Sequence, residues 1–473
     1  MVERMKVDLC VIGAGSGGLT VAAGASLMGA RVALIERGKM GGDCLNYGCI
    51  PSKSLLAAAR SAEAVRQSAR FGVVASLPEI DFAAVHDHVH QVIAAIAPHD
   101  SVARFKGLGV HVVEAEARFT GATEVSAGGQ LIAARRVVVA TGSSPAVPPL
   151  PGLGEAPYLT NETIFDLRER PQHLIVIGGG PIGIELAQAF RRLGARVTVI
   201  EMLEVLGRDD PELARVVTTR LRREGVAIHE RTEVVSVERT AAGIAVSTAG
   251  GTEARFEGSH LLVAVGRKAN VETLDLERAG IRRSARGIEV NRRLRTSNRK
   301  VYAVGDVAGG HQFTHLASHH AEVVLKNVLF RLPAKVDQRA LPWVTFTDPE
   351  LAHVGLNESQ ARARHGDIRI LRWPFAENDR AQAERQTDGL VKVITRRRGR
   401  VLGASIVGAH AGELIQSWVL ALAKGMKAGD VAGFISPYPT FGEANKRAAS
   451  SYFTPLLFSP RTQAIVRLLG RLG

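Results

Sequence analysis

Residues 7–36 read VDLCVIGAGSGGLTVAAGASLMGARVALIE, and residues 174–201 read LIVIGGGPIGIELAQAFRRLGARVTVIE. Each stretch has an apolar run, a glycine-rich turn, an amphipathic segment and a second apolar run that ends in Glu. This order is typical of a β-strand, an α-helix and a second strand parallel to the first. Because the unit occurs twice, the sequence predicts an α/β protein with two dinucleotide sites, which serve two cofactors or a cofactor and a substrate.

The glycines of both turns have the spacing GxGxxG that is typical of a pyrophosphate site. The first glycine allows a tight turn, the second lets the backbone approach the pyrophosphate, and the third lets the helix pack on the strand. The helix N-terminus then offers free N–H groups and a partial positive charge to the phosphates. The six positions are Gly13, Gly15 and Gly18 in the first turn and Gly178, Gly180 and Gly183 in the second.

A glutamate closes the second strand of each unit. Glu36 and Glu201 stand where a carboxylate accepts hydrogen bonds from ribose hydroxyls. At the second site, the negative charge of Glu201 repels the 2′-phosphate of NADP and favours NAD. Arg208 follows further along and could reach that phosphate, so NADP(H) stays open as the alternative.

The chain has 473 residues, enough for about three domains, and a formal net charge of +14. Its arginines are spread along the chain without a nucleic-acid-binding motif, so we expect no specific nucleic-acid partner. We find neither a membrane-spanning apolar run nor a secretory signal. Three cysteines are too few for the disulfide framework of a secreted protein, so we expect a cytoplasmic protein.

Two of the cysteines lie close together in the sequence. Residues 41–53 read GGDCLNYGCIPSK, with Cys44 and Cys49 separated by four residues. If this segment begins a helix, one turn brings the two sulfur atoms within disulfide distance, and the helix N-terminus lowers a thiol pKa. Zinc is the alternative, but it needs further ligands at matching spacing. We expect Cys10, in the first predicted strand, to be a small buried apolar residue.

Residues 41–53 resemble the redox-active disulfide segment of the flavoprotein (pyridine nucleotide) disulfide oxidoreductases, a family that includes dihydrolipoamide dehydrogenase, glutathione reductase and mercuric reductase. ATGSSP and AVGRKAN resemble the two crossings between the flavin and nicotinamide domains of that family. TSNRKVYAVGDVA resembles its second flavin motif, and PWVTFTDPELAHVG resembles the start of its dimerisation domain. These segments occupy residues 140–145, 264–270, 296–308 and 342–355, so the resemblance covers nearly the whole chain.

The family organisation implies two Rossmann-like domains and an α+β dimerisation domain at the C-terminus. The FAD-binding domain would comprise residues 1–148 and 272–340, the NAD(P)-binding domain residues 149–271, and the dimerisation domain residues 341–473. The protein would be a homodimer with a composite active site.

The resemblance also implies the path of the electrons. NAD(P)H gives hydride to FAD, which passes an electron pair to Cys49, the cysteine nearer the flavin, and frees Cys44 as the interchange thiol. Lys53 and Glu185 would form an ion pair beside the flavin. Asp306 would hold the ribityl chain, and Thr314 and His315 would begin a helix that stabilises the reduced ring. Further implied cofactor positions are Gly42, Asp43, Lys53, Ala115, Thr141, Gly142, Ser143 and Thr314 for FAD and Val234 and Gly266 for NAD.

One position departs from the family pattern. Members that act on disulfides carry a segment HPTxxE, whose histidine is the acid–base partner of the interchange thiol and whose glutamate orients the ring. Residues 436–443 read SPYPTFGE, so Glu443 is kept while Tyr438 replaces the histidine. A phenol with a pKa near 10 is a poor base at neutral pH. Tyrosine here resembles mercuric reductases, but the chain lacks their C-terminal cysteine pair. Tyr438 could also simply pack at the interface.

Three functions therefore compete. The first is a disulfide oxidoreductase similar to dihydrolipoamide dehydrogenase, whose substrate is a small or protein-bound disulfide or dithiol. The second is an NAD(P)H-dependent reductase of a metal ion or small electrophile, similar to mercuric reductase. The third is a non-catalytic flavin-binding partner of a membrane or nucleic acid.

Some segments lie outside these motifs. His86 and His90 share a face of a predicted helix, where a solvated surface is favoured over a metal site. The basic tail 444–473 is expected to cover the dimerisation domain, with a membrane surface as the less favoured alternative. Residues 375–384, FAENDRAQAE, have no chemical explanation in the sequence.

Overall fold

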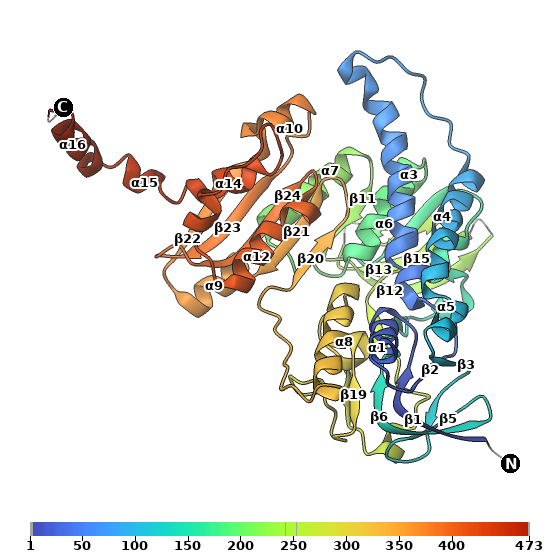
Figure 1. Ribbon diagram of the computed structural model, residues 1–473. Helices are drawn as coiled ribbons and strands as arrows, with labels where there is room; N and C mark the ends of the chain where they lie inside the picture. The colour runs from blue at the N-terminus through green and yellow to red at the C-terminus, as the bar shows by residue number, and fades with distance from the viewer. Residues whose placement is uncertain (1–2, 242, 252, 472–473) are drawn as a thin grey trace. The chain divides into compact units, whose positions relative to one another are not determined.

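The computed structural model describes residues 3–241, 243–251 and 253–471, and Figure 1 labels its elements. Contacts within the chain divide it into two compact units. The predicted borders of three domains at residues 148, 271 and 340 do not coincide with this division and stay a prediction. The first unit comprises Met1–Gly178, Ala189–Ile200 and Thr232–Asp337, and the second Gly179–Gln188, Glu201–Arg231 and Gln338–Gly473.

The first predicted strand–helix–strand unit is confirmed. Strand β1 (Glu3–Ile12) leads through the glycine turn into helix α1 (Ser16–Leu27) and strand β2 (Val32–Glu36), which pairs parallel with β1. The sheet has the order β3-β2-β1-β6-β5-β4, with β19 on β6. Its other strands are β3 (His111–Glu114), β4 (Arg118–Phe119), β5 (Glu124–Ala127), β6 (Gln130–Val139) and β19 (Val301–Ala303).

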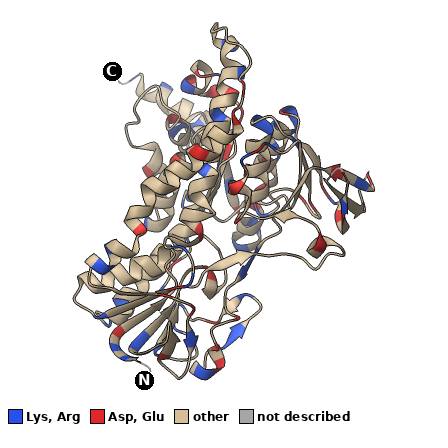
Figure 2. Ribbon diagram, turned by 90° about the vertical axis from the view of Figure 1, so that its right-hand side faces the viewer, with Lys and Arg blue, Asp and Glu red and all other residues tan. Residues whose placement is uncertain are grey.

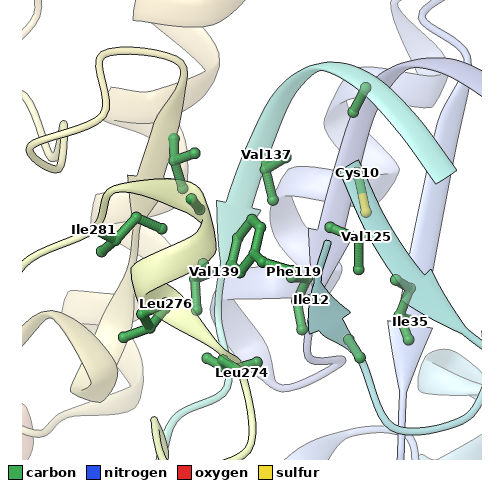
Figure 3. Packing of buried hydrophobic residues seen from close by; sticks show 14 of the residues in the cluster. Cys10, Ile12, Ile35, Phe119, Val125, Val137, Val139, Leu274, Leu276 and Ile281 are labelled. Atoms are coloured by element: carbon green, nitrogen blue, oxygen red, sulfur yellow. The ribbon is translucent and has the colours of Figure 1, made fainter. Parts of the chain in front are cut away.

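This sheet is covered on both faces, which is why Leu9–Ile12 of β1 and Val32–Ile35 of β2 are all apolar. Cys10 and Ile12 of β1 face one core cluster, while Leu9 and Val11 face the other, as the twofold period of a strand requires. Figure 3 shows Phe119 beside Val137 and Val139 in the first cluster. Cys10 is fully buried, as expected, and burial raises the pKa of its thiol to about 12.

The second predicted strand–helix–strand unit is confirmed as well. Strand β9 (His173–Ile177), helix α6 (Pro181–Arg192) and strand β10 (Arg196–Ile200) follow in order, and β9 pairs parallel with β10. These strands belong to a second sheet, and its strands within the first unit have the order β10-β9-β15-β8. The other strands there are β8 (Tyr158–Leu159), β15 (His260–Val263) and an antiparallel group of β12 (Glu233–Thr240), β13 (Gly243–Ala249) and β14 (Arg255–Gly258).

Three further helices of the first unit carry the polar residues discussed below. Helix α3 (Cys49–Gln67) lies beside α4 (Phe82–Ile96), and α8 (Thr314–Val328) packs against α1 (Figure 1). The two predicted crossings meet, because β7 (Ser143–Pro145) pairs antiparallel with β16 (Arg267–Ala269).

The second unit is built on an antiparallel sheet of order β20-β21-β24-β23-β22. Its core surrounds Trp418, which is fully buried and donates a hydrogen bond to Asn445 Oδ1 at 2.9 Å. The strands are β20 (Pro342–Thr345), β21 (Glu350–Gly355), β22 (Ile368–Pro374), β23 (Leu390–Arg396) and β24 (Val401–Gly408). The main helices are α7 (Pro211–Arg223), α9 (Glu358–His365), α12 (Gln416–Lys424) and α14 (Glu443–Ser450).

A buried lysine ties two distant segments of the second unit together. Lys392 on β23 is 3% exposed, and its Nζ lies 2.7 Å from Asp210 Oδ2, 2.8 Å from Glu212 Oε2 and 2.9 Å from Glu358 Oε2. Burial lowers the pKa of Lys392, but the three carboxylates raise it by more, so the pKa lies above its ordinary value. Removing one partner of such a cluster costs about 3–5 kcal/mol, because charge is left uncompensated.

The C-terminal tail differs from the expectation. Helices α15 (Thr454–Leu457) and α16 (Pro460–Leu469) contain no buried residue. Figure 1 shows them extending away from α14. The expectation that the tail 444–473 covers the dimerisation domain therefore holds for α14, whose Ala444, Asn445, Ala448 and Ala449 are buried, and is wrong for α15 and α16.

Two surface properties complete the fold. None of the helices in the described ranges is long and apolar enough to cross a bilayer. Figure 2 shows Lys and Arg scattered along the ribbon among Asp and Glu.

The third glycine of the first turn provides a test of the fold. A Cβ at residue 18 would lie 1.8 Å from the carbonyl oxygen of Gly13. Gly18→Ala is therefore expected to force β1 and α1 apart and to lower the free energy of unfolding by about 1–3 kcal/mol. Thermal unfolding of the flavin-loaded protein measures this. The control is Gly107→Ala in α5 (Val102–Gly107), where the new Cβ meets nothing within 4 Å. Equal stability of the two variants would contradict the argument.

Candidate active site

The two cysteines lie on different helices. Cys44 belongs to the short helix α2 (Gly42–Asn46), whereas Cys49 is the first residue of α3. The expectation that one helical turn joins them is wrong, because the helix is interrupted after Asn46 and a new helix begins after Gly48. A side chain at Gly48 would place a Cβ 2.8 Å from Asp43 Oδ2 and 3.4 Å from Cys44 Cα. A side chain at residue 48 would therefore crowd Asp43, and glycine avoids this where the second helix begins close to the first cysteine.

Cys44 and Cys49, the predicted redox couple, are both free cysteines. The interaction with Cys44 lowers the pKa of the Cys49 thiol, and removal from water works against it. The interaction with Cys49, together with burial, raises the pKa of the Cys44 thiol. Cys49 is therefore the more acidic thiol of the pair.

A second helix begins beside Cys49. Helix α8 starts at Thr314, as predicted, and Thr314 Oγ1 lies 3.4 Å from Cys49 Sγ. Cys49 therefore stands at the N-terminus of α3 and contacts the first residue of α8. Both helix ends carry partial positive charge, which favours a thiolate over a thiol.

The predicted ion pair of Lys53 and Glu185 stays a prediction. Lys53 follows Cys49 by one turn on α3, and its positive charge contributes to the lowered pKa of Cys49. In the second unit, Glu185 Oε1 accepts a hydrogen bond from the backbone N–H of Phe346 at 2.8 Å.

An arginine that the sequence did not single out connects the predicted flavin contacts. Arg267 on β16 lies 2.9 Å from Asp43 Oδ1 and 4.0 Å from Asp306 Oδ2, and it donates to Ser143 Oγ at 2.8 Å. Ser143 in turn donates to Asp306 at 2.6 Å, and burial raises the pKa of Asp306. Asn161 also donates to Asp43 at 3.1 Å. AVGRKAN contains this arginine, but only the pairing of β7 and β16 shows its partners.

The first glycine turn fits a dinucleotide pyrophosphate. Gly15 caps α1 without a side-chain hydrogen bond, and the first turn of α1 contains no acidic residue, so its N–H groups face the space that a phosphate would take. A Cβ at Gly13 would lie 2.3 Å from the carbonyl oxygen of Ala140, and one at Gly42 would lie 2.7 Å from Gly15 Cα. Glycine is needed at both positions, because a side chain would push the backbone of the turn away from its neighbour and would obstruct a ligand.

Glu36 is already engaged by the backbone. Its two carboxylate oxygens accept hydrogen bonds from Ala14 N–H at 2.6 Å and Gly38 N–H at 2.7 Å. Because each carboxylate oxygen has a second acceptor site, ribose hydroxyls can still bind there. Nearby, Thr141 and Gly142 bind Asn270 through a side-chain and a backbone hydrogen bond, and Ala115 follows β3.

Glu201 repeats this geometry at the second turn. Its oxygens accept from Gly179 N–H at 2.6 Å and Leu203 N–H at 2.8 Å. In the first unit, a Cβ at Gly178 would lie 2.5 Å from the carbonyl oxygen of Ala264. The equal geometry of the two turns supports two dinucleotide sites. Of the other predicted positions, Gly180 and Gly183 surround the start of α6, Val234 lies on β12 and Gly266 precedes β16.

Tyr438 is held by the segment that had no explanation in the sequence. Its hydroxyl donates to Asp379 Oδ2 at 2.8 Å, and this hydrogen bond together with the negative charge raises the pKa of Tyr438. Asn378 beside it donates to the carbonyl oxygen of Thr440 at 3.1 Å. Residues 375–384 therefore position the loop that carries Tyr438. Glu443 accepts hydrogen bonds from Arg447 at 3.1 and 3.2 Å.

The histidine pair on α4 is only partly exposed, with 12% of the His86 side chain and 40% of the His90 side chain accessible to solvent, so the expected solvated face holds for His90 and not for His86. The rings of His86 and His90 stack with centroids 4.0 Å apart, and His86 Nδ1 lies 2.9 Å from Asp87 Oδ1. No group of three or more metal-ligating side chains occurs among the residues that the structure describes.

Comparison with known proteins identifies the family. Residues 7–321 match the family described as pyridine nucleotide-disulphide oxidoreductase, and residues 341–449 match its dimerisation domain. The chain belongs to this family. It is therefore a flavoprotein oxidoreductase that binds FAD and NAD(P)H, and its dimerisation domain supports a homodimer.

The relatives include reductases of different substrates. The chain is 35% identical to a mercuric reductase of Streptomyces lividans, over 94% of this chain and 96% of that one. It is 36% identical to a dihydrolipoyl dehydrogenase of Geobacillus stearothermophilus, again over 94% and 96%. The Cu(II) complex of the HOCl-induced flavoprotein disulfide reductase RclA from Escherichia coli has a TM-score of 0.84 and 28% identity, over 93% of this chain and 98% of that one.

The hydrogen bond from Thr314 provides a test of the thiolate. Thr314→Val keeps the shape of the side chain and removes the hydroxyl beside Cys49 Sγ, so the pKa of Cys49 should rise. Below that pKa, less thiolate is present, and alkylation of Cys49 should slow about tenfold, as expected for a hydrogen bond to a charged group. The rate of iodoacetamide labelling of the reduced protein against pH measures this.

Ser318→Ala is the matched control, because Ser318 donates to the carbonyl oxygen of Thr314 one turn further along α8. The assignment of Cys49 as the thiolate fails if both variants label at the wild-type rate throughout the pH range.

Proposed function

We propose that this enzyme uses NAD(P)H to reduce a soft metal ion or a small electrophile at the thiols of Cys44 and Cys49. One observation carries the proposal: the hydroxyl of Tyr438 donates to Asp379 at 2.8 Å, and the pKa of Tyr438 is raised. Tyr438 stands at the position of the acid–base histidine, and it loses its proton less readily than an ordinary tyrosine. It is therefore an even poorer base at neutral pH.

The absence of a base at this position affects the two substrate classes differently. Oxidation of a dithiol substrate requires removal of a proton from a thiol whose pKa is about 8.5, and general-base help contributes about 10²–10⁴-fold. A metal ion brings no proton to remove. It needs thiolate ligands, and the lowered pKa of Cys49 provides one at neutral pH. Two adjacent sulfur atoms suit soft ions such as Hg²⁺ and Cu⁺.

The residues divide the work as follows. Gly13, Gly15, Gly18 and Glu36 would hold FAD, together with Asp43, Ser143, Arg267 and Asp306. When bound, FAD supplies a carrier of two electrons between NAD(P)H and the Cys44–Cys49 couple. Cys44 meets the substrate, and Cys49 keeps the thiolate. For Hg²⁺ the overall reaction is NAD(P)H + Hg²⁺ → NAD(P)⁺ + Hg⁰ + H⁺, which balances in charge and electrons.

We propose further features that the sequence and the family support. Glu201 selects NADH over NADPH through its negative charge. In the homodimer, the 436–443 segment of one subunit faces the thiol pair of the other. The enzyme works in the cytoplasm, where thiols are kept reduced.

Oxidation of a dithiol is the second candidate, because the chain keeps the cysteine pair and Glu443 and is 36% identical to a dihydrolipoyl dehydrogenase. Steady-state assays of purified enzyme distinguish the two. The proposal predicts faster NADH consumption with Hg²⁺ or Cu²⁺ than with lipoamide. It fails if lipoamide and dihydrolipoamide are turned over as fast as the metal ions.

Substitution of Tyr438 tests the reason for this preference. Tyr438→His introduces a side chain with a pKa near neutrality and should raise dihydrolipoamide turnover by about 10²–10⁴-fold. Tyr438→Phe, the matched control, removes the hydroxyl without adding a base and should leave that turnover low. An unchanged rate in Tyr438→His would show that the missing base does not limit dithiol chemistry.

A further inference from the structure

The C-terminal tail has an exposed apolar face. Seven of its large apolar side chains are between 56% and 71% exposed, and none of the residues of α15 and α16 is buried. The core of the second unit is complete without them, because its last buried residue is Ala449. The seven are Leu456, Leu457, Phe458, Ile465, Val466, Leu468 and Leu469.

The tail is nevertheless an ordered pair of helices. Ser459 Oγ caps α16 by accepting from Thr462 N–H at 3.2 Å, and Pro460 occupies the first turn. Thr462 Oγ1 donates to the carbonyl oxygen of Leu456 at 2.8 Å and so joins the two helices. Hydrogen bonds within the tail thus fix its shape, and its apolar face stays exposed to solvent in the single chain.

Helix α16 is amphipathic. Ile465, Val466, Leu468 and Leu469 fall on one side of the helix, which Arg461 joins in the first turn, whereas Gln463 and Arg467 fall on the other. A basic helix with an apolar face and a polar face lies in the plane of a membrane interface with its apolar side in the acyl region.

The charge of the tail selects between occupants. Residues 444–473 contain no Asp or Glu. Arg461, Arg467 and Arg471 form no ion pair within the described residues. An anionic lipid surface complements both the apolar face and the arginines.

We propose that residues 454–471 form a lipid-binding arm that holds this enzyme on the surface of an anionic membrane. The arm lies on the bilayer and does not cross it, because no helix within the described residues has the length and apolarity of a span. This inference is independent of the substrate that the thiol pair reduces.

Flotation of the FAD-loaded full chain with vesicles tests the proposal. Vesicles of phosphatidylcholine with about 30% phosphatidylglycerol are compared with vesicles of phosphatidylcholine alone, at low and high salt. We expect binding to the anionic vesicles and its weakening by salt. Each Arg→Gln change at 461, 467 or 471 should weaken partitioning about fivefold.

Two paired variants separate the apolar face from the tail as a whole. Ile465→Ser with Leu469→Ser should weaken vesicle binding at least about tenfold, because the buried apolar area is lost. Gln463→Ser with Ala464→Ser, two serines outside that face, should bind as the wild type does. Turnover of NADH with a soluble acceptor should be unchanged in both, which shows that both fold.

Two results would overturn the proposal. The first is the failure of the wild-type chain to bind anionic vesicles. The second is a change in the mass of the Ile465→Ser, Leu469→Ser variant from dimer to monomer in light scattering, which would make the tail a contact between two copies.

Discussion

The chemistry of this protein depends on the surroundings of the Cys49 sulfur. Cys49 begins α3, Thr314 Oγ1 at the start of α8 lies 3.4 Å from Cys49 Sγ, and the interaction with Cys44 lowers the pKa of the Cys49 thiol. Gly48 lies directly before Cys49, where α3 follows closely on α2. Without this arrangement, a thiol with an ordinary pKa would be mostly protonated at neutral pH.

In the proposed function, the rest of the first unit holds this pair beside a dinucleotide. The parallel sheet sends α1 from the glycine turn, and the pairing of β7 with β16 brings Arg267 between Asp43 and Asp306. Asp43 is a neighbour of Cys44, so one arginine connects the predicted flavin contacts to the redox pair. In the second unit, the hydrogen bond from Tyr438 to Asp379 raises the pKa of Tyr438, and in the proposed function this position therefore offers no base to a dithiol substrate.

The features that could be predicted from the sequence are those that local patterns determine. The two strand–helix–strand units, the start of α8 at Thr314 and the burial of Cys10 follow from apolar periodicity, glycine spacing and resemblance. Contacts between distant segments could not be predicted, because the partners of Arg267, Tyr438 and Lys392 depend on how strands pair. The interruption of the helix at Gly48 was also missed, because the sequence pattern of a helix does not show where packing ends it. The exposure of α15 and α16 was missed because the same pattern does not show whether an apolar face is covered.

Alkylation of the cysteines under anaerobic NADH tests the central claim most directly. The oxidised, FAD-loaded protein is treated with N-ethylmaleimide before and after one equivalent of NADH, and the labelled peptides are mapped. The account predicts no label on Cys44 and Cys49 before NADH and label on both afterwards, with the buried Cys10 labelled only after unfolding. Labelling of Cys44 and Cys49 that does not respond to NADH would contradict it.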